Sequence, residues 1–462
     1  MKILNPEQLE EKRKSILDSI QSSIESAKRS AIHSVEIFAA YGQGGSVGIE
    51  KNDIQSFETY EETVYGIRVI ESGCEGFVTT NDGSSLLSSI QEAHALAKAQ
   101  TTPDKDLELA PKPSLLTTAI EELDPSLYDL DPNCILETAK KILDYREGRF
   151  PKVSLDSAGA SLSYSLKAIG TSQGIFRSEA SSSLSASFMG MAIDGDDISS
   201  FDSESAFGRT PAEFEKDFEE RYDIFLKNCM NGLGAKSISS FKGYLYLPPD
   251  AIFSFLIGGF LSSLSATSIR KKKSKMEGKL NKQVLSDKLT IFSDPTDMSL
   301  ASCTSFDREG MNTEKISIVE QGILKNYFYN HFEAKKAGLL KSNGCATGGS
   351  ASTPGCGPKA LQVGAGETDL NSMIHPDGKA IWVNRFSGNS SGTSGDFSGV
   401  IKGGFLLDKG EKIPVKEIQI AGNMYDVLKN QIAAVSKERE LLGKSTWAPS
   451  LLIEGIDITG TL

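Results

Sequence analysis

The sequence predicts an α+β protein in which an N-terminal mixed α/β unit precedes a β-rich, largely antiparallel C-terminal domain. In the first 100 residues, two segments with helical spacing of apolar residues flank several strand-like segments. Beyond Lys279, short apolar segments alternate with Gly, Asn, Asp and Ser, which is typical of β-rich structure. For these 462 residues we expect an N-terminal domain at 1–100, a linker and central α+β region at 101–240, and a C-terminal domain at 241–462.

The first 100 residues predict two helices around a group of strands. Apolar residues from Leu9 to Ile24 form one stripe on a charged helix at residues 7–30. A second helix is expected at residues 84–99, and a glycine turn at residues 41–45. The expected strands lie at residues 35–38, 47–50, 54–58, 64–70 and 77–80.

The central region combines linkers with strands and helices. Residues 101–113 and 123–132 are rich in proline and charge, as linkers often are. Alternating small and apolar residues at 153–187 predict strands, with a turn at residues 170–174. Helices are expected at residues 134–145 and 211–230, the second with Phe214, Phe218 and Tyr222 on one face.

A β-hairpin is the clearest element of the C-terminal region. Two apolar segments flank Glu320, Gln321 and Gly322, so we expect a hairpin at residues 316–329 with Gly322 at positive φ. The other expected elements are strands at residues 244–247 and 451–458 and helices at residues 251–263 and 424–439.

The composition predicts a soluble, cytoplasmic protein. A net charge of −12 argues against non-specific or direct binding to nucleic acid. The six cysteines are spread along the chain without a CxxC pair, which is typical of reduced thiols in the cytosol. Neither a signal peptide nor a membrane-spanning segment is expected.

Metal-binding and nucleotide-binding patterns are weak. No two of the four histidines are spaced to share one metal on a helix, and His331, His375, Cys345 and Cys356 follow no known zinc spacing. Both of these cysteines are expected to be solvent-accessible thiols. The glycines at residues 41–45 and 388–392 match neither a dinucleotide fingerprint nor a P-loop.

Two other segments are candidate contact surfaces. The basic residues 270–275 are expected to form a solvated loop, or alternatively to contact an acidic peptide or partner. Residues 387–399 are dense in hydroxyls and glycine, and such a loop could pair with an extended peptide through its main chain. Its candidate contact residues for substrate or partner are Asn389, Ser394, Gly395 and Asp396.

The acidic turn before the hairpin supports two interpretations. Asp307, Arg308 and Glu309 precede a turn glycine, and the simpler interpretation is a solvated connection with a local ion pair. The alternative is a polar contact with substrate or with a partner subunit.

Several segments, taken in order, resemble the TldD/PmbA family. They span most of the chain, and the resemblance is weakest at residues 100–240. The segments are residues 65–70, 73–77, 93–97, 274–279, 306–310, 322–327, 394–398, 404–405, 420–423 and 449–453. Catalytic TldD-type members carry an HExxxH helix and a later cysteine as metal ligands. Here the corresponding helix at residues 251–263 has no histidine, and residues 441–449 have no cysteine.

The resemblance therefore implies the PmbA/TldE branch, a metallopeptidase homologue without its own metal site, catalytic residues or cofactor. It implies a cytosolic heterodimer with a zinc-bearing, TldD-like subunit that processes short or unfolded peptides. A homodimer is the other assembly considered. Two alternatives remain open: an independent hydrolase around His331, Cys345 and His375, and a non-enzymatic regulator of the kind that the family's older gyrase-modulator label suggests.

Overall fold

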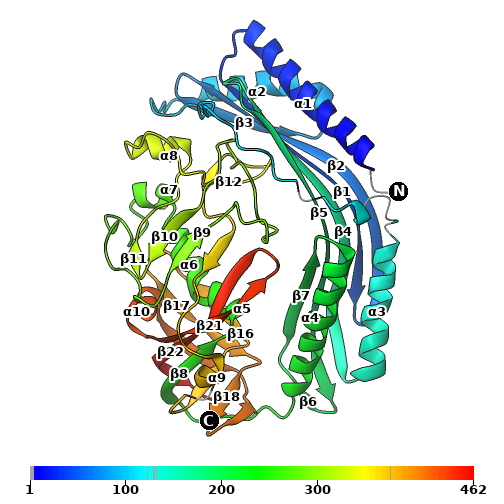
Figure 1. The fold of residues 1–462 in the computed structure, drawn as a ribbon, viewed down its shortest axis with the longest axis vertical. Coiled ribbons are helices and arrows are strands. Elements are labelled where there is room, and N and C mark those ends of the chain that lie inside the picture. The colour runs from blue at the N-terminus through cyan, green and yellow to red at the C-terminus, as the bar shows by residue number, and fades with distance from the viewer. Residues whose placement is uncertain (1–4, 122, 128–130, 132, 375, 462) are drawn as a thin grey trace.

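The computed structural model describes residues 5–121, 123–127, 131, 133–374 and 376–461. Two β-rich halves lie side by side along the long axis of the molecule (Figure 1). The N-terminal half is built on a seven-stranded sheet covered by helices, and the C-terminal half on a thirteen-stranded, mostly antiparallel sheet. The predicted fold class is confirmed.

The seven-stranded sheet contains the longest strands of the protein. Its order is β3-β2-β1-β4-β5-β6, with β7 also paired to β5, and all neighbours are antiparallel. The predicted turn at residues 170–174 separates β4 from β5. The strands are β1 (Val35–Glu50), β2 (Asp53–Glu71), β3 (Cys74–Thr80), β4 (Val153–Thr171), β5 (Phe176–Asp194), β6 (Asp197–Ile198) and β7 (Asp202–Gly208).

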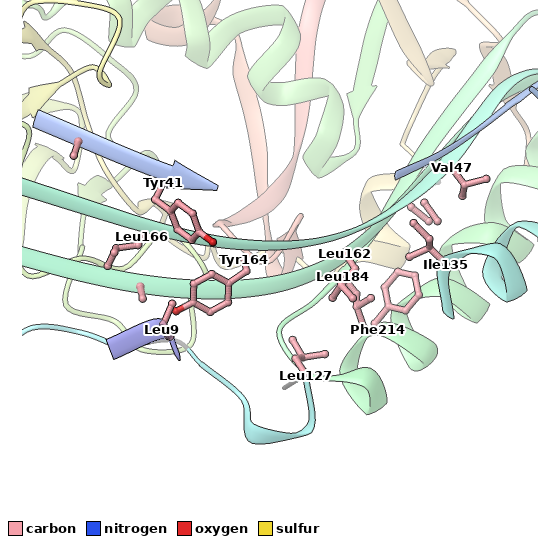
Figure 2. Packing of buried hydrophobic residues seen from close by; sticks show 14 of the residues in the cluster. Leu9, Tyr41, Val47, Leu127, Ile135, Leu162, Tyr164, Leu166, Leu184 and Phe214 are labelled. Carbon is pink, nitrogen blue, oxygen red and sulfur yellow. The ribbon is translucent and has the colours of Figure 1, made fainter. Parts of the chain in front are cut away.

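Four helices cover one face of this sheet, so its other face is turned toward the C-terminal half (Figure 1). The predicted helices are all present: α1 (Pro6–Arg29), α2 (Leu86–Ala99), α3 (Cys134–Arg149) and α4 (Pro211–Asn231). Alternate residues of β4, such as Leu162, Tyr164 and Leu166, pack with the helices in a single core (Figure 2). This core contains residues from both the 1–100 and the 101–240 ranges.

The predicted glycine turn at residues 41–45 is wrong. These residues lie inside β1, and the strands expected at 35–38 and 47–50 are one continuous strand. A Cβ atom on Gly44 would lie 2.2 Å from the Leu162 carbonyl oxygen, so glycine permits close strand approach here. In the same way, the strands expected at 54–58 and 64–70 are parts of β2.

The C-terminal sheet has a central path β11-β10-β9-β14-β22-β8-β15-β18-β19, with β16, β17, β20 and β21 off this path. Its strands are β8 (Phe241–Leu247), β9 (Ile291–Ser293), β10 (Ile316–Glu320), β11 (Ile323–Leu324), β14 (Leu361–Val363), β15 (Ala380–Trp382), β16 (Arg385–Ser390), β17 (Asp396–Lys402), β18 (Phe405–Asp408), β19 (Glu411–Pro414), β20 (Ile418–Asn423), β21 (Ile432–Leu442) and β22 (Thr446–Thr459). A separate pair is formed by β12 (Ala346–Thr347) and β13 (Gly355–Cys356). Short helices are α7 (Ala266–Arg270), α8 (His331–Lys336), α9 (Leu370–Ile374) and α10 (Met424–Asn430).

The predicted hairpin is formed by β10 and β11. Gly322 has φ +76°, and a Cβ atom there would lie 2.3 Å from the Leu285 carbonyl oxygen. Glycine is therefore required both by the turn and by the close approach of the preceding loop.

The helix expected at residues 251–263 is helical throughout but not uniform. It consists of α5 (Pro249–Ile252), a π-helical turn, η3 (Phe253–Ile257), and α6 (Gly258–Ser263). Phe255 anchors the π turn, since its ring lies 4.7 Å from the ring of Phe386 and 4.6 Å from that of Phe397. The π turn therefore packs on the β16–β17 hairpin.

The single helix expected at residues 424–439 is wrong. Helix α10 ends at Asn430, and β21 begins at Ile432. β21 pairs with β22 from Ile432↔Ile453 to Leu442↔Thr446, with two register shifts. This ladder satisfies the backbone of a segment whose local pattern favours a helix, so tertiary pairing decides its structure.

Candidate functional site

The acidic turn at Asp307 is buried, so its interpretation as a solvated connection is wrong. Asp307, Arg308 and Glu309 are each 1–2% exposed. The Asp307 carboxylate accepts hydrogen bonds from the backbone N–H groups of Glu309, Met311 and Ala346 at 2.9, 3.0 and 3.1 Å. Burial raises the pKa of Asp307, and these donors oppose the shift because they favour the charged form. The residue therefore organises the loop around it.

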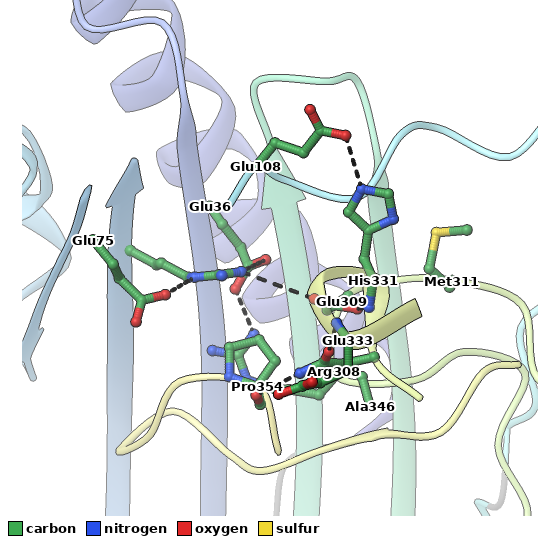
Figure 3. Close-up of polar contacts among 12 residues, drawn as sticks. Glu36, Glu75, Glu108, Arg308, Glu309, Met311, His331, Glu333, Ala346 and Pro354 are labelled. Carbon is green, nitrogen blue, oxygen red and sulfur yellow. Dashed lines mark hydrogen bonds and ion pairs between the residues drawn. The ribbon is translucent and has the colours of Figure 1, made fainter. Parts of the chain in front are cut away.

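Arg308 reaches across to the N-terminal sheet. Its Nη1 donates to Glu36 Oε1 of β1 at 2.8 Å, and both side chains are almost completely buried (Figure 3). Its Nε and Nη2 donate to the carbonyl oxygens of Gly349 and Ser352 at 3.1 and 3.2 Å. The guanidinium also lies 4.4 Å from the centre of the Phe38 ring. Arg308 thus joins the two halves through a buried ion pair with Glu36.

Arg68 of β2 extends this network. It pairs with Glu75, with Glu36 at 3.5 Å and with Glu309 at 4.0 Å (Figure 3). Glu309 Oε2 accepts the backbone N–H of His331 at 2.7 Å. Burial and the nearby Asp307 charge raise the pKa of Glu309, and Arg68 opposes this. These residues form an internal junction, in which only Glu75 is partly exposed.

The second group of predicted contact residues lies on the β16–β17 hairpin. Asn389 and Asp396 are exposed, Ser394 is half-buried and Gly395 is buried with φ +83°. Asp396 Oδ1 accepts from Asn423 Nδ2 at 2.9 Å. Within the described residues, no hydrogen bond or ion pair joins this hairpin to the Asp307 turn.

The alternative of an independent hydrolase around His331, Cys345 and His375 loses one of its expected features, an accessible thiol. Cys345 was expected to be accessible but is 3% exposed, and burial raises the pKa of its thiol. His331 lies against Glu108 at 3.3 Å, and burial lowers its pKa. Cys356 is half-buried, and His375 lies outside the described residues.

In the basic segment 270–275, Lys271–Lys273 and Lys275 are exposed, as expected. Arg270 is not part of a loop, because it ends α7 and pairs with the buried Glu333 at 2.8 Å.

Among the cavities between the two halves, three follow β4, β5 and β7 along the open face and edge of the N-terminal sheet. The first, of about 680 Å³, lies between β7, α4, α5 and β16. Four carboxylates and two guanidiniums line it: Asp202, Glu204, Asp250, Glu440, Arg221 and Arg385. Arg221 pairs with Glu204 at 3.8 Å and also with Glu440. Negative charge is therefore in excess at this end.

The second cavity, of about 580 Å³, lies farther along β4 and β5. Its charged residues are Lys167, Lys359 and Glu179. Lys167 Nζ lies 2.8 Å from Glu179 Oε2. Burial lowers the pKa of Lys359, while the Asp307 charge opposes this shift. Positive charge is in excess at this end.

The third cavity, of about 480 Å³, lies between the other two and is lined by five serines together with glycine and apolar residues such as Ala186 and Phe207. It shares Ser187 and Ser205 with the first cavity. The loop between β21 and β22 extends toward the N-terminal sheet here. Its Gly443 lines the third cavity, and Ser445 and Thr446 line the second. We refer to the three cavities together as the interhalf groove.

The sequence did not predict the charged residues of the groove. Asp202, Glu204, Arg221, Asp250 and Glu440 come from four separate parts of the chain, with no local spacing that relates them. Of these residues, only Asp250 directly precedes a helix expected from the sequence, the one at residues 251–263.

Glu204 provides a test of the electrostatics of the first cavity. Burial, followed by the charge of Asp250, raises the pKa of Glu204 from 4.5 to about 8. The folded chain therefore binds one more proton than the unfolded chain between these values, and stability falls as pH rises through this window. We expect Glu204→Gln to remove a loss on the order of 3 kcal/mol between pH 5 and pH 8.

Urea unfolding at several pH values measures this difference. Glu215→Gln, on an exposed part of α4, controls for the removal of one negative charge. Parallel pH profiles for Glu204→Gln and the unaltered chain would contradict the assignment.

Two family profiles match the chain. The C-terminal domain of the PmbA/TldA metallopeptidases matches residues 242–460, and domain 1 of the same metallopeptidases matches residues 35–97. The chain belongs to the PmbA/TldD family. The predicted resemblance is confirmed.

Relatives place the chain on the PmbA/TldE branch. It is 25% identical to metalloprotease PmbA of Escherichia coli, over 93% of each chain. It is 28% identical to a metalloprotease PmbA homologue of Haemophilus influenzae, over 92% of each chain. The crystal structure of TldE from Thermococcus kodakarensis has the same fold, with a TM-score of 0.85 at 19% identity, over 96% of this chain and 100% of that one.

The donor set of the two family metal segments does not fit a zinc ion. The buried side chains of residues 251–261 are apolar, and they include Ala251, Ile252, Phe255, Leu256 and Phe260. Residues 441–449 supply no cysteine or histidine. In the described part of the chain, no group of three or more His, Cys, Asp or Glu side chains is arranged to hold a metal ion.

No described helix of this PmbA/TldD-family chain combines the length and the apolar character needed to cross a membrane.

Proposed function

We propose that this chain is the metal-free subunit of a cytosolic two-subunit peptidase, in which a TldD-like partner binds zinc. In the proposed complex, the chain completes the chamber in which short or unfolded peptides are processed. The observation that supports this proposal is a polar groove beside the helical segment at residues 251–263. This segment corresponds to the family's metal-binding helix, but its buried side chains at residues 251–261 are apolar. Ala251 begins the first of the two segments that correspond to the family's metal positions, and Glu440 directly precedes the second. Both residues line this groove.

The groove supports a role in holding substrate. A chain that had lost its function would be expected to fill the space between its halves with apolar side chains, whereas here three neighbouring cavities carry hydroxyls and charges among their lining residues. Burying a charge lowers the stability of a fold unless the charge is paired. A cluster of partly buried charges is therefore more typical of a functional site than of a packed core.

Affinity capture of the tagged full chain from its native host, followed by metal quantification, tests the proposal. We expect a TldD-like protein to be captured, with about one zinc per complex located in the partner. Peptide hydrolysis should require both subunits, because zinc must activate the attacking water.

Hydrolysis by the partner-free chain that is lost with a chelator would overturn the proposal. Stoichiometric zinc that disappears in Cys345→Ser would instead support an independent hydrolase. DNA binding that weakens steeply with salt would support the regulator alternative.

A further inference from the structure

The two ends of the interhalf groove have opposite charge. Asp202, Glu204, Asp250 and Glu440 outnumber two guanidiniums in the first cavity, whereas Lys167 and Lys359 outnumber Glu179 in the second. A ligand that lies along the groove would therefore meet carboxylates at one end and ammonium groups at the other.

The first cavity contains a buried acceptor that lacks a donor. Asp202 is 6% exposed, and its Oδ1 accepts from Asn384 Nδ2 at 2.9 Å. No donor reaches hydrogen-bonding geometry at Oδ2, although the Asn228 amide lies close enough to favour the charged form. Burial raises the pKa of Asp202, while its hydrogen bonds and the Arg385 charge oppose this shift. Oδ2 still lacks a donor, which a ligand could supply.

An ammonium group fits this end. It donates up to three hydrogen bonds and accepts none, so it complements an unpaired carboxylate oxygen among other carboxylates. The Nε–H of Arg385 is also buried without an acceptor in the same cavity. A carbonyl oxygen close to the ammonium group, as in the first residue of a peptide, would accept from it.

A carboxylate fits the other end. Lys359 is half-buried and makes no ion pair within 4.0 Å of any described carboxylate. Burial lowers its pKa, the Asp307 charge opposes this shift, and the Lys167 charge adds to it. A ligand carboxylate between these two ammonium groups would add a second counter-charge to that of Glu179 in the cavity.

The floor between the two ends suits an extended main chain. Paired hydroxyls join β4 to β5 at Ser161 and Ser185, which line the third cavity, and at Ser165 and Ser181, which line the second, with oxygen–oxygen distances of 2.8 Å in both pairs. Ser163 and Ser183 form a third pair at 2.9 Å between the two cavities. Each hydroxyl can both donate and accept, so the floor favours no particular side chain.

The length of the floor sets the length of the ligand. Ser157 lines the first cavity and Lys167 the second. Ten residue steps along β4 at about 3.3 Å each span about 33 Å. An extended peptide of about ten residues has the same length.

We propose that the interhalf groove binds a short extended peptide in one direction, with its amino-terminal ammonium at Asp202 and its terminal carboxylate between Lys167 and Lys359. The inference rests on the proposed function, from which it takes a peptide as the ligand. It adds the direction in which the peptide lies, its length and the recognition of its two ends. Binding involves no covalent step in this chain.

Isothermal titration of the full chain with four decapeptides of alternating Ser and Ala tests the proposal. One peptide has free ends, one is N-acetylated, one is C-amidated and one carries both caps. We expect each single cap to weaken binding by about tenfold or more, because each removes one charge-assisted contact. A free hexapeptide should bind less tightly than the free decapeptide, because it cannot reach both ends.

Two variants assign the ends. Asp202→Asn should abolish the effect of acetylation but keep that of amidation, and Lys359→Met should do the reverse. The four-peptide comparison requires only the unaltered chain, so it remains decisive if either variant fails to fold.

Equal affinity for all four decapeptides, or no binding of any of them, would overturn the inference. The proposed function is judged separately by zinc content and by hydrolysis with the partner. If the two-subunit complex hydrolyses free and doubly capped peptides equally well, the proposed function stands and terminal recognition fails.

Discussion

Replacing Arg308 with methionine is expected to lower the free energy of unfolding by about 3–5 kcal/mol, the cost of breaking a buried ion pair from one side. The substitution leaves Glu36, which is 1% exposed, with only Arg68 as a cation at 3.5 Å. It also leaves the carbonyl oxygens of Gly349 and Ser352 without the Arg308 donors. Urea unfolding monitored by circular dichroism measures the loss.

Arg29→Met on the exposed face of α1 is the matched control, and we expect it to change stability by less than about 0.5 kcal/mol. Adding Glu36→Gln to Arg308→Met should recover part of the loss, because the double variant no longer buries the Glu36 charge. A loss below about 1 kcal/mol for Arg308→Met would show that the junction does not hold the halves together.

Replacing Phe255 with alanine is expected to cost about 3–5 kcal/mol, since it removes a large ring from a packed core. Phe255 is 1% exposed and lies between Phe386 and Phe397. Its loss should also loosen the β16–β17 hairpin from the π turn. Urea unfolding, together with the rate of proteolysis at residues 391–395, measures both effects.

Phe57→Ala is the control, because Phe57 is 39% exposed on β2 and should change stability by less than about 1 kcal/mol. Equal losses for the two phenylalanines would contradict the anchoring role of Phe255. Unchanged proteolysis at the hairpin in Phe255→Ala would separate its stability effect from its contact with β16 and β17.

Local signals in the sequence predicted the elements that depend on local contacts. The i, i+4, i+8 spacing of Phe214, Phe218 and Tyr222 predicted the buried face of α4. Gly322 predicted the β10–β11 turn, because its required backbone geometry is a property of the residue itself. In both cases the signal lies within a few residues of the element.

Elements and contacts set by distant partners were not predicted. β21 is a strand because β22 pairs with it, and the glycines of β1 accommodate the neighbouring strand β4 and not a turn. Asp307, Arg308 and Glu309 were placed in solvent because isolated charges are usually exposed. The partners of Arg308 and Glu309 in β1 and β2 lie more than 200 residues away, so no local spacing could show the burial.

The residues of the candidate site also divide into those that local sequence predicted and those that depend on distant segments. The hydroxyl-rich segment around Asn389 was recognised from its composition, but it forms part of a hairpin and not one long loop. The charged residues of the interhalf groove were missed because each is ordinary in its own segment. Only the packing of the two halves brings Asp202 close to Asp250 and Glu440.

The 272-residue separation between Glu36 and Arg308 has a consequence for synthesis of the chain. At about 5–20 residues per second, the ribosome adds Arg308 roughly 15–55 s after Glu36. During this interval the nascent N-terminal sheet has no C-terminal half to cover its open face. Because serine hydroxyls line the β4–β5 part of that face, this part can remain in water without offering an aggregation surface. The same hydroxyls that suit a peptide in the mature protein thus protect the incomplete chain.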